Sequence, residues 1–260
     1  MKTDLLPVSG VLGDISESYR TVLGGNLVGI YVHGSLAFGC FSPGVSDIDF
    51  IAVVENEPTP AQKTEIIKET LRLEKSNPPK GLEMHVLTLD ACQSFSHPCR
   101  FSLHYSVSHR AAAEKDPAAF ACNMHGTDPD LAAHVTVMNA VGFPLFGPKV
   151  SAVFSPVPQK DYLDSIMFDV ASSEEDIAEN PVYFTLNLCR VLAYVREQKI
   201  LSKADGGKWG LENLPPEFSG LINSALRAYR GASAYAPSPN EEKAFARFAL
   251  EKIRAILKTT

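Results

Sequence analysis

The chain changes its secondary-structure pattern partway along, and this change limits the folds that are open to it. Predicted strands and helices alternate before residue 154, whereas only helices are predicted after residue 161. The segment FSPVPQKD at 154–161 separates the two patterns and is typical of a linker. A chain of 260 residues can form one large domain or two modest ones. The change of pattern favours two: an α+β domain with a mixed sheet at 1–155 and an all-α helical bundle at 156–260.

Composition narrows the class of protein further. Acidic side chains outnumber basic ones by 30 to 24, and the resulting net charge of -6 disfavours a general nucleic-acid binder. The five cysteines include no CxxC pair, so we expect reduced thiols rather than disulfides or a zinc ribbon. No apolar run approaches the ~20 residues that span a bilayer, and the first residues do not resemble a signal peptide. We expect a cytoplasmic enzyme, or a protein with cationic partners.

Apolar spacing and chain breakers predict the elements of each half. Residues 91–127 mix polar and Ala-rich pieces, and we assign no elements to them. In the first half we expect strands at 28–33, 47–54 and 82–89, helices at 11–23, 60–74 and 129–142, and a short helix after Gly34. In the second half we expect four helices, at about 163–177, 181–195, 218–229 and 241–258.

The segment HGSLAFGCFSPGVSDIDFIAVV, residues 33–54, carries the most chemical information. The first strand leads through Gly34 and Ser35 into a helix, whose free backbone N–H groups can bind a phosphate. Gly34 also lets a ligand approach the backbone closely. Ser46 offers a hydroxyl for a phosphate oxygen. These features predict a phosphate-binding turn.

Two aspartates open the second strand. Asp47 and Asp49 point to one face because side chains alternate along a strand. Their repulsion at a few ångströms is on the order of several kcal/mol in a partly desolvated site, and a bridging Mg²⁺ would relieve it. Either a lone DxD or a lone Gly-Ser is usually structural, but their combination across two strands predicts a catalytic site.

A third acid lies on the strand LEMHVLTL. Leu82, Met84 and Val86 share one face, so Glu83 and His85 share the other. If this strand lies beside the strand of Asp47 and Asp49, Glu83 reaches the same site. For His85 we expect a polar position on the surface or on the wall of a cleft.

The GSLAFG turn followed by SDIDF resembles the nucleotidyltransferase fold of the DNA polymerase beta superfamily. The segments NLCRVLAYV, LSKADGGKWGLENLP and LINSALRAYRG resemble the carboxy-terminal domain of the aminoglycoside (3'')(9) adenylyltransferases. Members of this family have two domains and transfer AMP from ATP to a hydroxyl of streptomycin or spectinomycin. The resemblance therefore implies a nucleotidyltransferase domain at 1–155, a helical bundle at 156–260, and ATP and acceptor bound in a cleft between them.

The resemblance also implies roles for single residues. Glu83 would be the general base that deprotonates the acceptor hydroxyl, while Asp47 and Asp49 would hold Mg²⁺ and act in catalysis. Lys203, in a predicted loop after the second bundle helix, would reach the ATP phosphates. The remaining nucleotide contacts would be Gly34, Ser35, Ser46, Asp130, Arg190 and Tyr229.

The implied acceptor contacts depart from the family pattern. Family members that accept streptomycin as well as spectinomycin carry tryptophans at two positions, and here Ser108 or its neighbour and the loop SSEEDIAENPVY have none. Asn180 replaces an aligned acid, although Glu174, Glu175, Asp176 and Glu179 are near it in the sequence. Glu83, Ser108, Asn180 and Tyr183 would contact the acceptor. These departures favour spectinomycin, or another cationic aminocyclitol, over streptomycin.

Two other functions stay open on the sequence alone. An enzyme of this fold can act on another small molecule, a protein or a tRNA, although the acidic balance disfavours tRNA. A non-catalytic ATP-binding module is the second alternative, and it would not need Glu83. We expect a monomer that uses Mg²⁺ and ATP, acts on a small cationic aminocyclitol or aminoglycoside, and has no nucleic-acid or membrane partner.

Overall fold

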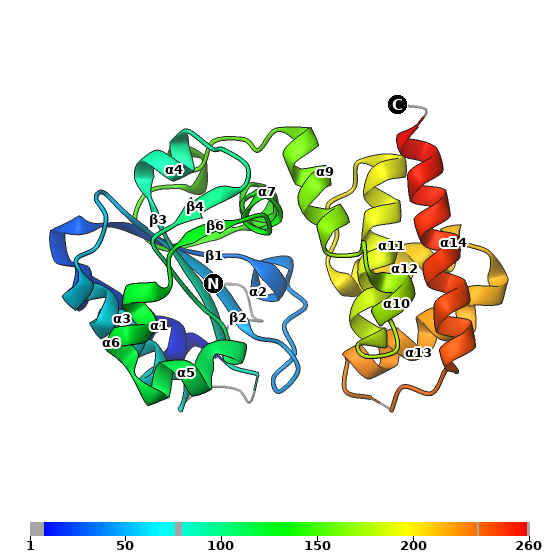
Figure 1. Cartoon of the computed structure of the whole chain (residues 1–260), viewed down its shortest axis with the longest axis horizontal. Helices are drawn as coiled ribbons and strands as arrows, with labels where there is room; N and C mark the ends of the chain where they lie inside the picture. The colour runs from blue at the N-terminus through cyan, green and yellow to red at the C-terminus, as the bar shows by residue number, and fades with distance from the viewer. Residues whose placement is uncertain (1–7, 76–79, 233, 259–260) are drawn as a thin grey trace. The chain divides into compact units, whose positions relative to one another are not determined.

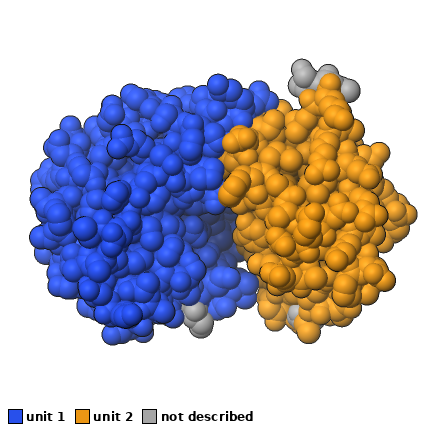
Figure 2. Space-filling model, viewed as in Figure 1, with its two compact units in different colours: residues 1–162 blue, residues 163–260 orange. Residues whose placement is uncertain are grey.

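A computed structural model describes residues 8–75, 80–232 and 234–258 of the chain. The chain divides into two compact units, residues 1–162 and residues 163–260, which Figure 2 shows in different colours. Strands are confined to the first unit (Figure 1) within the described residues. The predicted α+β fold with a mixed sheet followed by helices is confirmed.

The central sheet of the first unit has five strands in the order β5-β3-β2-β1-β7. Strands β2 and β3 are parallel, and the other neighbours are antiparallel. This combination makes the sheet mixed, as predicted. The strands are β1 (Leu27–Val32), β2 (Ile48–Val54), β3 (Leu82–Thr88), β5 (Leu103–Tyr105) and β7 (Phe143–Phe146).

Helices cover both faces of this sheet (Figure 1). The apolar stripe of α1 packs with α3, and Phe50 and Met84 of the sheet lie in the same core. On the other face, Leu131 and Val135 of α7 pack over Ile51 and Val53. The helices of this unit are α1 (Ser9–Leu23), α2 (Gly34–Phe38), α3 (Pro60–Glu74), α4 (Leu89–Gln93), α5 (Arg110–Lys115), α6 (Pro117–Asn123), α7 (Leu131–Val141) and α8 (Val150–Val153).

The ends of α3 follow from local sequence signals. Pro60 occupies the first turn, and the side chain of Thr59 accepts a hydrogen bond from the backbone N–H of Gln62. The Gln62 side chain in turn accepts from the backbone N–H of Thr59, which completes a capping box. The predicted bounds of this helix agree with the structure.

Residues 91–127 form several short elements. Strands β4 (Cys99–Phe101) and β6 (Gly126–Asp128) pair as a separate antiparallel sheet. A 3-10 turn at Val107–His109 leads into α5. Elements of three to seven residues are too short for apolar periodicity to reveal, which explains why none was predicted here.

The second unit contains helices only, within the described residues. The predicted helices at 181–195, 218–229 and 241–258 are present with small shifts of their ends. The predicted helix at 163–177 is wrong as one element, because α9 ends at Phe168 and a short α10 follows. The helices are α9 (Gln159–Phe168), which spans the boundary between the units, α10 (Ser173–Asp176), α11 (Pro181–Glu197), α12 (Lys203–Asn213), α13 (Ser219–Tyr229) and α14 (Pro239–Leu257).

Helix α12 was not predicted, and the loop expected at Lys203 is wrong, because Lys203 is the first residue of this helix. Ser202 caps this helix by accepting a hydrogen bond from the backbone N–H of Asp205. Glycines are poor helix formers, but here they allow close packing. A Cβ at Gly207 would lie 2.6 Å from Leu226, and one at Gly210 would lie 2.7 Å from the Cys189 sulfur. The low helix propensity of KADGGKWG is thus offset by tight contact with α11 and α13.

No helix of the described chain is long and apolar enough to cross a membrane. All five cysteines are free thiols, as predicted.

Candidate active site

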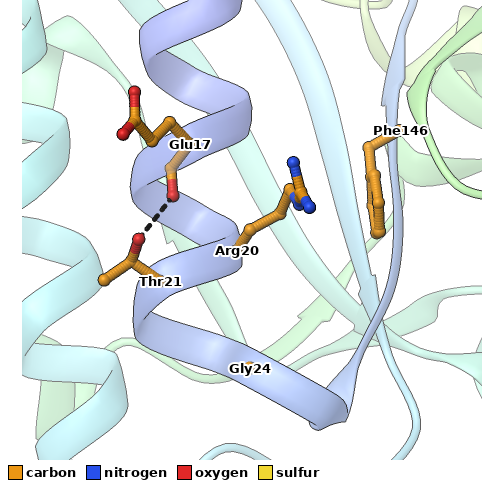
Figure 3. Close-up of a pocket in the computed structure, with 5 residues that line it drawn as sticks. All are labelled: Glu17, Arg20, Thr21, Gly24 and Phe146. Carbon is orange, nitrogen blue, oxygen red and sulfur yellow. Dashed lines mark hydrogen bonds between the residues drawn. The ribbon is translucent and has the colours of Figure 1, made fainter.

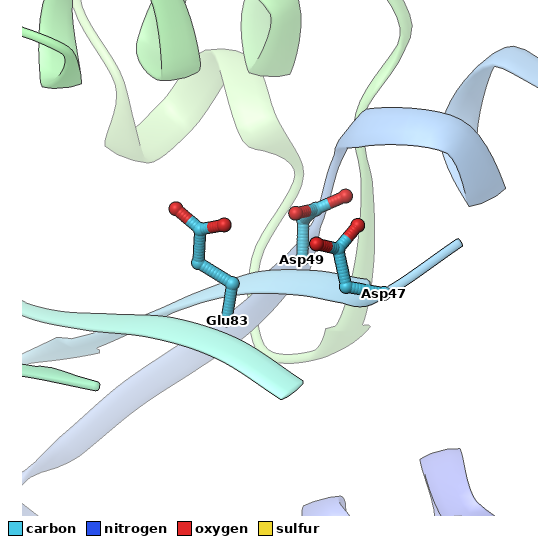
Figure 4. A group of neighbouring side chains, drawn as sticks. All are labelled: Asp47, Asp49 and Glu83. Atoms are coloured by element: carbon cyan, nitrogen blue, oxygen red, sulfur yellow. The ribbon is translucent and has the colours of Figure 1, made fainter. Parts of the chain in front are cut away.

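Three carboxylates meet at one end of the central sheet, where β2 and β3 begin. Asp47 directly precedes β2, Asp49 lies on β2, and Glu83 lies on β3. One carboxylate oxygen from each lies within 4.8 Å of the others. Figure 4 shows the three side chains pointing to the same side of the strands. The structure therefore brings together the three acids that the sequence singled out.

Strand alternation and register explain this arrangement. Ile48 and Phe50 are buried in the core, so the aspartates between and beside them face the other way. In the parallel pair, Asp49 stands opposite Glu83. A shift of one residue in either strand would send a carboxylate into the apolar core.

The donor set fits a magnesium ion. All three carboxylates are partly exposed, and their oxygens are the ligand type that Mg²⁺ prefers. Like charges this close repel, and a divalent cation between them would offset the repulsion. The side chains of Asp47 and Asp49 lie next to one another on the same side of the strand (Figure 4), an arrangement that suits two ligands of one cation.

The phosphate-binding turn predicted at Gly34 lies against the same acids. Gly34 has φ +61° and opens α2, and a Cβ at this position would overlap the Asp49 carboxylate. The backbone N–H of His33 donates to the Asp49 carbonyl at 3.1 Å. The Ser35 hydroxyl is buried and has no hydrogen-bond partner among the described residues. A buried hydroxyl without a partner, one residue after Gly34, can donate to a phosphate oxygen.

Ser46 shapes the loop that precedes the aspartates. Its side chain is 4% exposed, and its hydroxyl accepts the backbone N–H of Ser42 at 3.1 Å. The backbone N–H of Ser46 also donates to the Ser42 carbonyl at 2.9 Å. Ser46 thus closes a tight turn immediately before Asp47.

Asp130 lies at the start of α7, where its backbone N–H donates to the Asp128 carboxylate at 2.8 Å. The other Asp128 oxygen contacts His85 Nε2 at 3.0 Å. These bonds lower the pKa of Asp128 to about 2 against the opposing effect of burial. The expectation of a polar surface or cleft-wall position for His85 is wrong, since its side chain is 1% exposed.

His85 belongs to a histidine cluster that sequence reasoning missed. Its ring stacks on His104 at 4.0 Å, and His134 lies 5.5 Å from His85 and 4.9 Å from His33. Burial lowers the pKa of His33 and of His85, and together with the neighbouring His85 it lowers the pKa of His104 to about 3. The rings come from β3, β5, α7 and the turn between β1 and α2, so no local sequence motif predicts the cluster.

Ser108 lies in the 3-10 turn after β5. Its hydroxyl forms a hydrogen bond of 2.8 Å with the hydroxyl of Ser106. The next residue, His109, accepts the backbone N–H of Ser106 through Nδ1 at 3.2 Å. Burial lowers the pKa of His109, while the charge of Glu83 acts in the opposite direction. His109 is therefore close enough to Glu83 for their charges to interact.

In the second unit, Lys203 and Tyr183 lie together. The Lys203 ammonium is 4.9 Å from the centre of the Tyr183 ring, within the range of a cation–π contact. Arg190 lies on α11, two turns after Tyr183. Its guanidinium donates to the Leu201 carbonyl at 2.8 Å and to the Asn187 side-chain oxygen at 2.9 Å. Arg190 therefore holds the segment that leads into Lys203.

The other predicted residues of this unit lie at helix ends. Tyr229 is the last residue of α13, and Asn180 precedes α11. The Asn180 side chain makes no capping hydrogen bond within the described part of the chain. Of the nearby acids, Glu174 pairs with Arg247 at 2.8 Å.

A separate open depression lies on the first unit, between α1 and β7. Arg20 and Phe146 face each other across it, with the guanidinium 4.8 Å from the ring centre (Figure 3). The Thr21 hydroxyl donates to the Glu17 carbonyl at 2.9 Å. None of the predicted site residues lines this depression.

Comparisons with known proteins agree with the architecture. The model of the aminoglycoside adenylyltransferase C-terminal domain matches residues 152–252. A crystal structure of spectinomycin adenyltransferase AAD(9) from Enterococcus faecialis, with ATP and spectinomycin, superposes with a TM-score of 0.80. The superposition covers 95% of this chain and 99% of the AAD(9) chain, at 20% sequence identity. At that identity the likeness establishes a shared fold.

Curated relatives match along most of their length. The spectinomycin 9-adenylyltransferase of Campylobacter jejuni is 22% identical over 245 residues, which cover 92% of this chain and 93% of the relative. The aminoglycoside (3'') (9) adenylyltransferase of Klebsiella pneumoniae is 24% identical over 233 residues, 86% of each chain. These matches confirm the resemblance to the aminoglycoside adenylyltransferases that the motifs indicated, and residues 152–252 match the model of that family's carboxy-terminal domain.

Proposed function

We propose that this adenylyltransferase transfers AMP from MgATP to a hydroxyl of an aminocyclitol antibiotic of the spectinomycin type and releases pyrophosphate. The observation that carries the proposal is the meeting of Asp47, Asp49 and Glu83 within 4.8 Å, next to the Gly34 turn. The names of the relatives supply the class of acceptor.

Glu83 acts as the general base. Its carboxylate takes the proton of the acceptor hydroxyl, and the oxygen attacks the α-phosphorus of ATP. A new phosphorus–oxygen bond forms as the bond to the β-phosphate oxygen breaks, and pyrophosphate leaves with that electron pair. A partly exposed carboxylate beside two aspartates can accept this proton. Correct positioning of the hydroxyl and the α-phosphorus accounts for much of the rate enhancement.

Asp47 and Asp49 hold the metal. When bound, Mg²⁺ would neutralise charge on the phosphate oxygens during transfer. The aspartates' own task is to orient that ion beside Glu83, so that base and phosphate stand on the same face of the sheet. Gly34, Ser35 and Ser46 line the phosphates, with Gly34 leaving room for them and the unsatisfied Ser35 hydroxyl donating.

The remaining nucleotide contacts are assigned by the family resemblance. Arg190, Lys203 and Tyr229 in the second unit, and Asp130 in the first, bind ATP. Lys203 suits the triphosphate because ammonium groups pair with phosphate oxygens. Its present contact with the Tyr183 ring is weak enough to exchange for a phosphate.

The acceptor contacts are Glu83, Ser108, Asn180 and Tyr183. The absence of tryptophan from the two family positions favours a compact aminocyclitol over streptomycin. Acids in the segment 174–179 carry the charge that an ammonium-bearing acceptor needs. We assign the transferase chemistry to a nucleotidyltransferase domain at 1–155. The helical bundle at 156–260 would add contacts to the acceptor and to the nucleotide. The protein would act as a cytoplasmic monomer without nucleic-acid partners.

Pyrophosphate release, measured with and without a panel of aminocyclitols and aminoglycosides, tests this function. We expect release that depends on both Mg²⁺ and spectinomycin. Release with a tRNA or a protein acceptor alone would instead indicate an enzyme that modifies a macromolecule. ATP binding without release under any condition would indicate a non-catalytic module.

A further inference from the structure

Glu74, at the end of α3, is buried against the first residue of β3. Its side chain is 3% exposed, and its Oε1 accepts the backbone N–H of Leu82 at 3.0 Å. Leu82 immediately precedes Glu83. The buried carboxylate therefore holds the backbone at the position from which the proposed base extends.

Two further donors complete the environment of this carboxylate. The Tyr105 hydroxyl donates to Oε2 at 2.6 Å, and Arg110 Nε donates to the same oxygen at 2.9 Å. Burial and the neighbouring carboxylate raise the pKa of Tyr105, so its hydroxyl keeps its proton and donates. Glu74 thus joins α3, β3, β5 and α5 through charge-assisted hydrogen bonds, which are the strong ones.

Gly81 connects this anchor to the strand of the aspartates. It has φ +93°, and a Cβ there would overlap Glu74 Oε1 and the Val107 side chain. Its carbonyl accepts the backbone N–H of Ile48 at 3.1 Å. Residue 81 is therefore tied to the start of β2 and residue 82 to Glu74, immediately before the register pair of Asp49 and Glu83.

We propose that Glu74 is a positioning residue for Glu83, which it holds at the depth where the base meets Asp47 and Asp49. The inference rests on the proposed function, because that function is what makes Glu83 a general base. Proton transfer needs the base within hydrogen-bond reach of the hydroxyl, and a displacement of about 1 Å lowers turnover by as much as ~100-fold. Glu74 contacts neither ATP nor acceptor in this account, so it acts on the rate through the backbone alone.

A matched control lies on the same helix. Glu69 of α3 also accepts a hydroxyl and an arginine, from Ser18 at 2.8 Å and from Arg72 Nε at 3.0 Å. Neither partner lies on β2 or β3. Glu69→Gln therefore removes a carboxylate with the same kinds of donor, at 24% exposure, without touching the backbone of Glu83.

Glu74→Gln keeps the size of the side chain but has only one acceptor oxygen. That oxygen will face Tyr105 and Arg110, which offer two donors, and the amide NH₂ will face the Leu82 N–H. We expect kcat to fall roughly tenfold while KM for MgATP stays within about twofold, because the metal ligands stay in place. Amide exchange at Leu82, followed by NMR, should quicken roughly tenfold. Glu69→Gln should change none of the three.

Equal kcat for the two variants, or an unchanged Leu82 exchange rate in Glu74→Gln, would overturn the inference. If Glu74→Gln does not fold, Tyr105→Phe removes one donor only and should lower kcat in the same direction, with unchanged kcat counting against the inference. The exchange measurement needs no acceptor. A wild-type chain that transfers AMP to nothing would therefore defeat the proposed function, while Leu82 exchange would still decide whether Glu74 anchors β3.

Discussion

Asp49 on β2 stands directly opposite Glu83 on β3, in a parallel pair whose register continues from Ile48 to Val54. Parallel strands begin at the same edge of a sheet, so this register places both carboxylates, with Asp47, at one edge. The pairing turns two motifs that are more than thirty residues apart into one site.

Removing one aspartate should abolish most of the turnover without unfolding the chain. Asp47→Asn or Asp49→Asn keeps the side-chain shape but takes away a metal-binding charge, and we expect kcat to fall on the order of a hundredfold or more. The unfolding temperature should not fall, because one source of like-charge repulsion is gone. Turnover near that of the wild type in either variant would defeat the metal-site assignment.

Substitution of the proposed base should separate binding from chemistry. Glu83→Gln leaves Asp47 and Asp49 in place, so MgATP should bind with nearly the wild-type affinity while AMP transfer drops by about 100-fold or more. Calorimetric titration with MgATP and a transfer assay check the two parts. Loss of ATP binding would instead reassign Glu83 to a structural or metal-binding role.

Gly34→Ala should harm activity more than stability. The left-handed φ costs an alanine about 1 kcal/mol, and the added Cβ must also displace the Asp49 carboxylate. Gly44 offers a matched control, since it has φ +81° but nothing within 4 Å of a Cβ. Urea unfolding should give similar losses for both alanine variants, whereas only Gly34→Ala should lose at least about tenfold in kcat. Equal activities in the two variants would count against the close approach of Gly34 and Asp49.

The histidine cluster should make the fold sensitive to acid. Burial lowers the pKa of His33, His85 and His104 below the ~6.5 of an unfolded chain. Below pH about 6.5 the unfolded chain therefore takes up protons that the folded chain refuses, and the free energy of unfolding falls by at most about 1.4 kcal/mol per pH unit for each histidine. For His104 this loss continues until the pH reaches about 3.

His104→Asn tests this origin of the acid sensitivity. The asparagine can still donate to the Met84 carbonyl, which His104 Nδ1 contacts at 3.1 Å, but it does not titrate. Urea unfolding at pH 7.5 and 5 should show a smaller loss of stability in this variant than in the wild type. Replacing the exposed His125 by asparagine should leave the loss unchanged. The same loss in all three proteins would contradict the assignment.

Much of the fold was predictable because its signals are local. The capping box at Thr59 and the apolar stripe of α13 are contained within single elements, and the alternation in IDFI fixed which side of β2 is polar. Helix α12 was missed because its glycines oppose helix formation locally, and only the contacts of Gly207 and Gly210 with neighbouring helices explain it.

The site was predictable to the same extent. Asp47, Asp49 and Glu83 follow from alternation and from the adjacency of two strands. The partnership of His85 with Asp128 and that of Glu74 with Leu82 join residues 43 and 8 positions apart through turns that no periodic pattern encodes. Sequence reasoning therefore found the acids that face the ligand and missed the buried groups that hold the site's backbone.

Mass spectrometry of spectinomycin after incubation with ATP, Mg²⁺ and the protein tests the central claim most directly. The account predicts a product that carries one AMP with the wild type, equimolar pyrophosphate, and almost no product with Glu83→Gln. The account is contradicted if the wild type leaves spectinomycin unmodified. It is also contradicted if Glu83→Gln forms the product equally well.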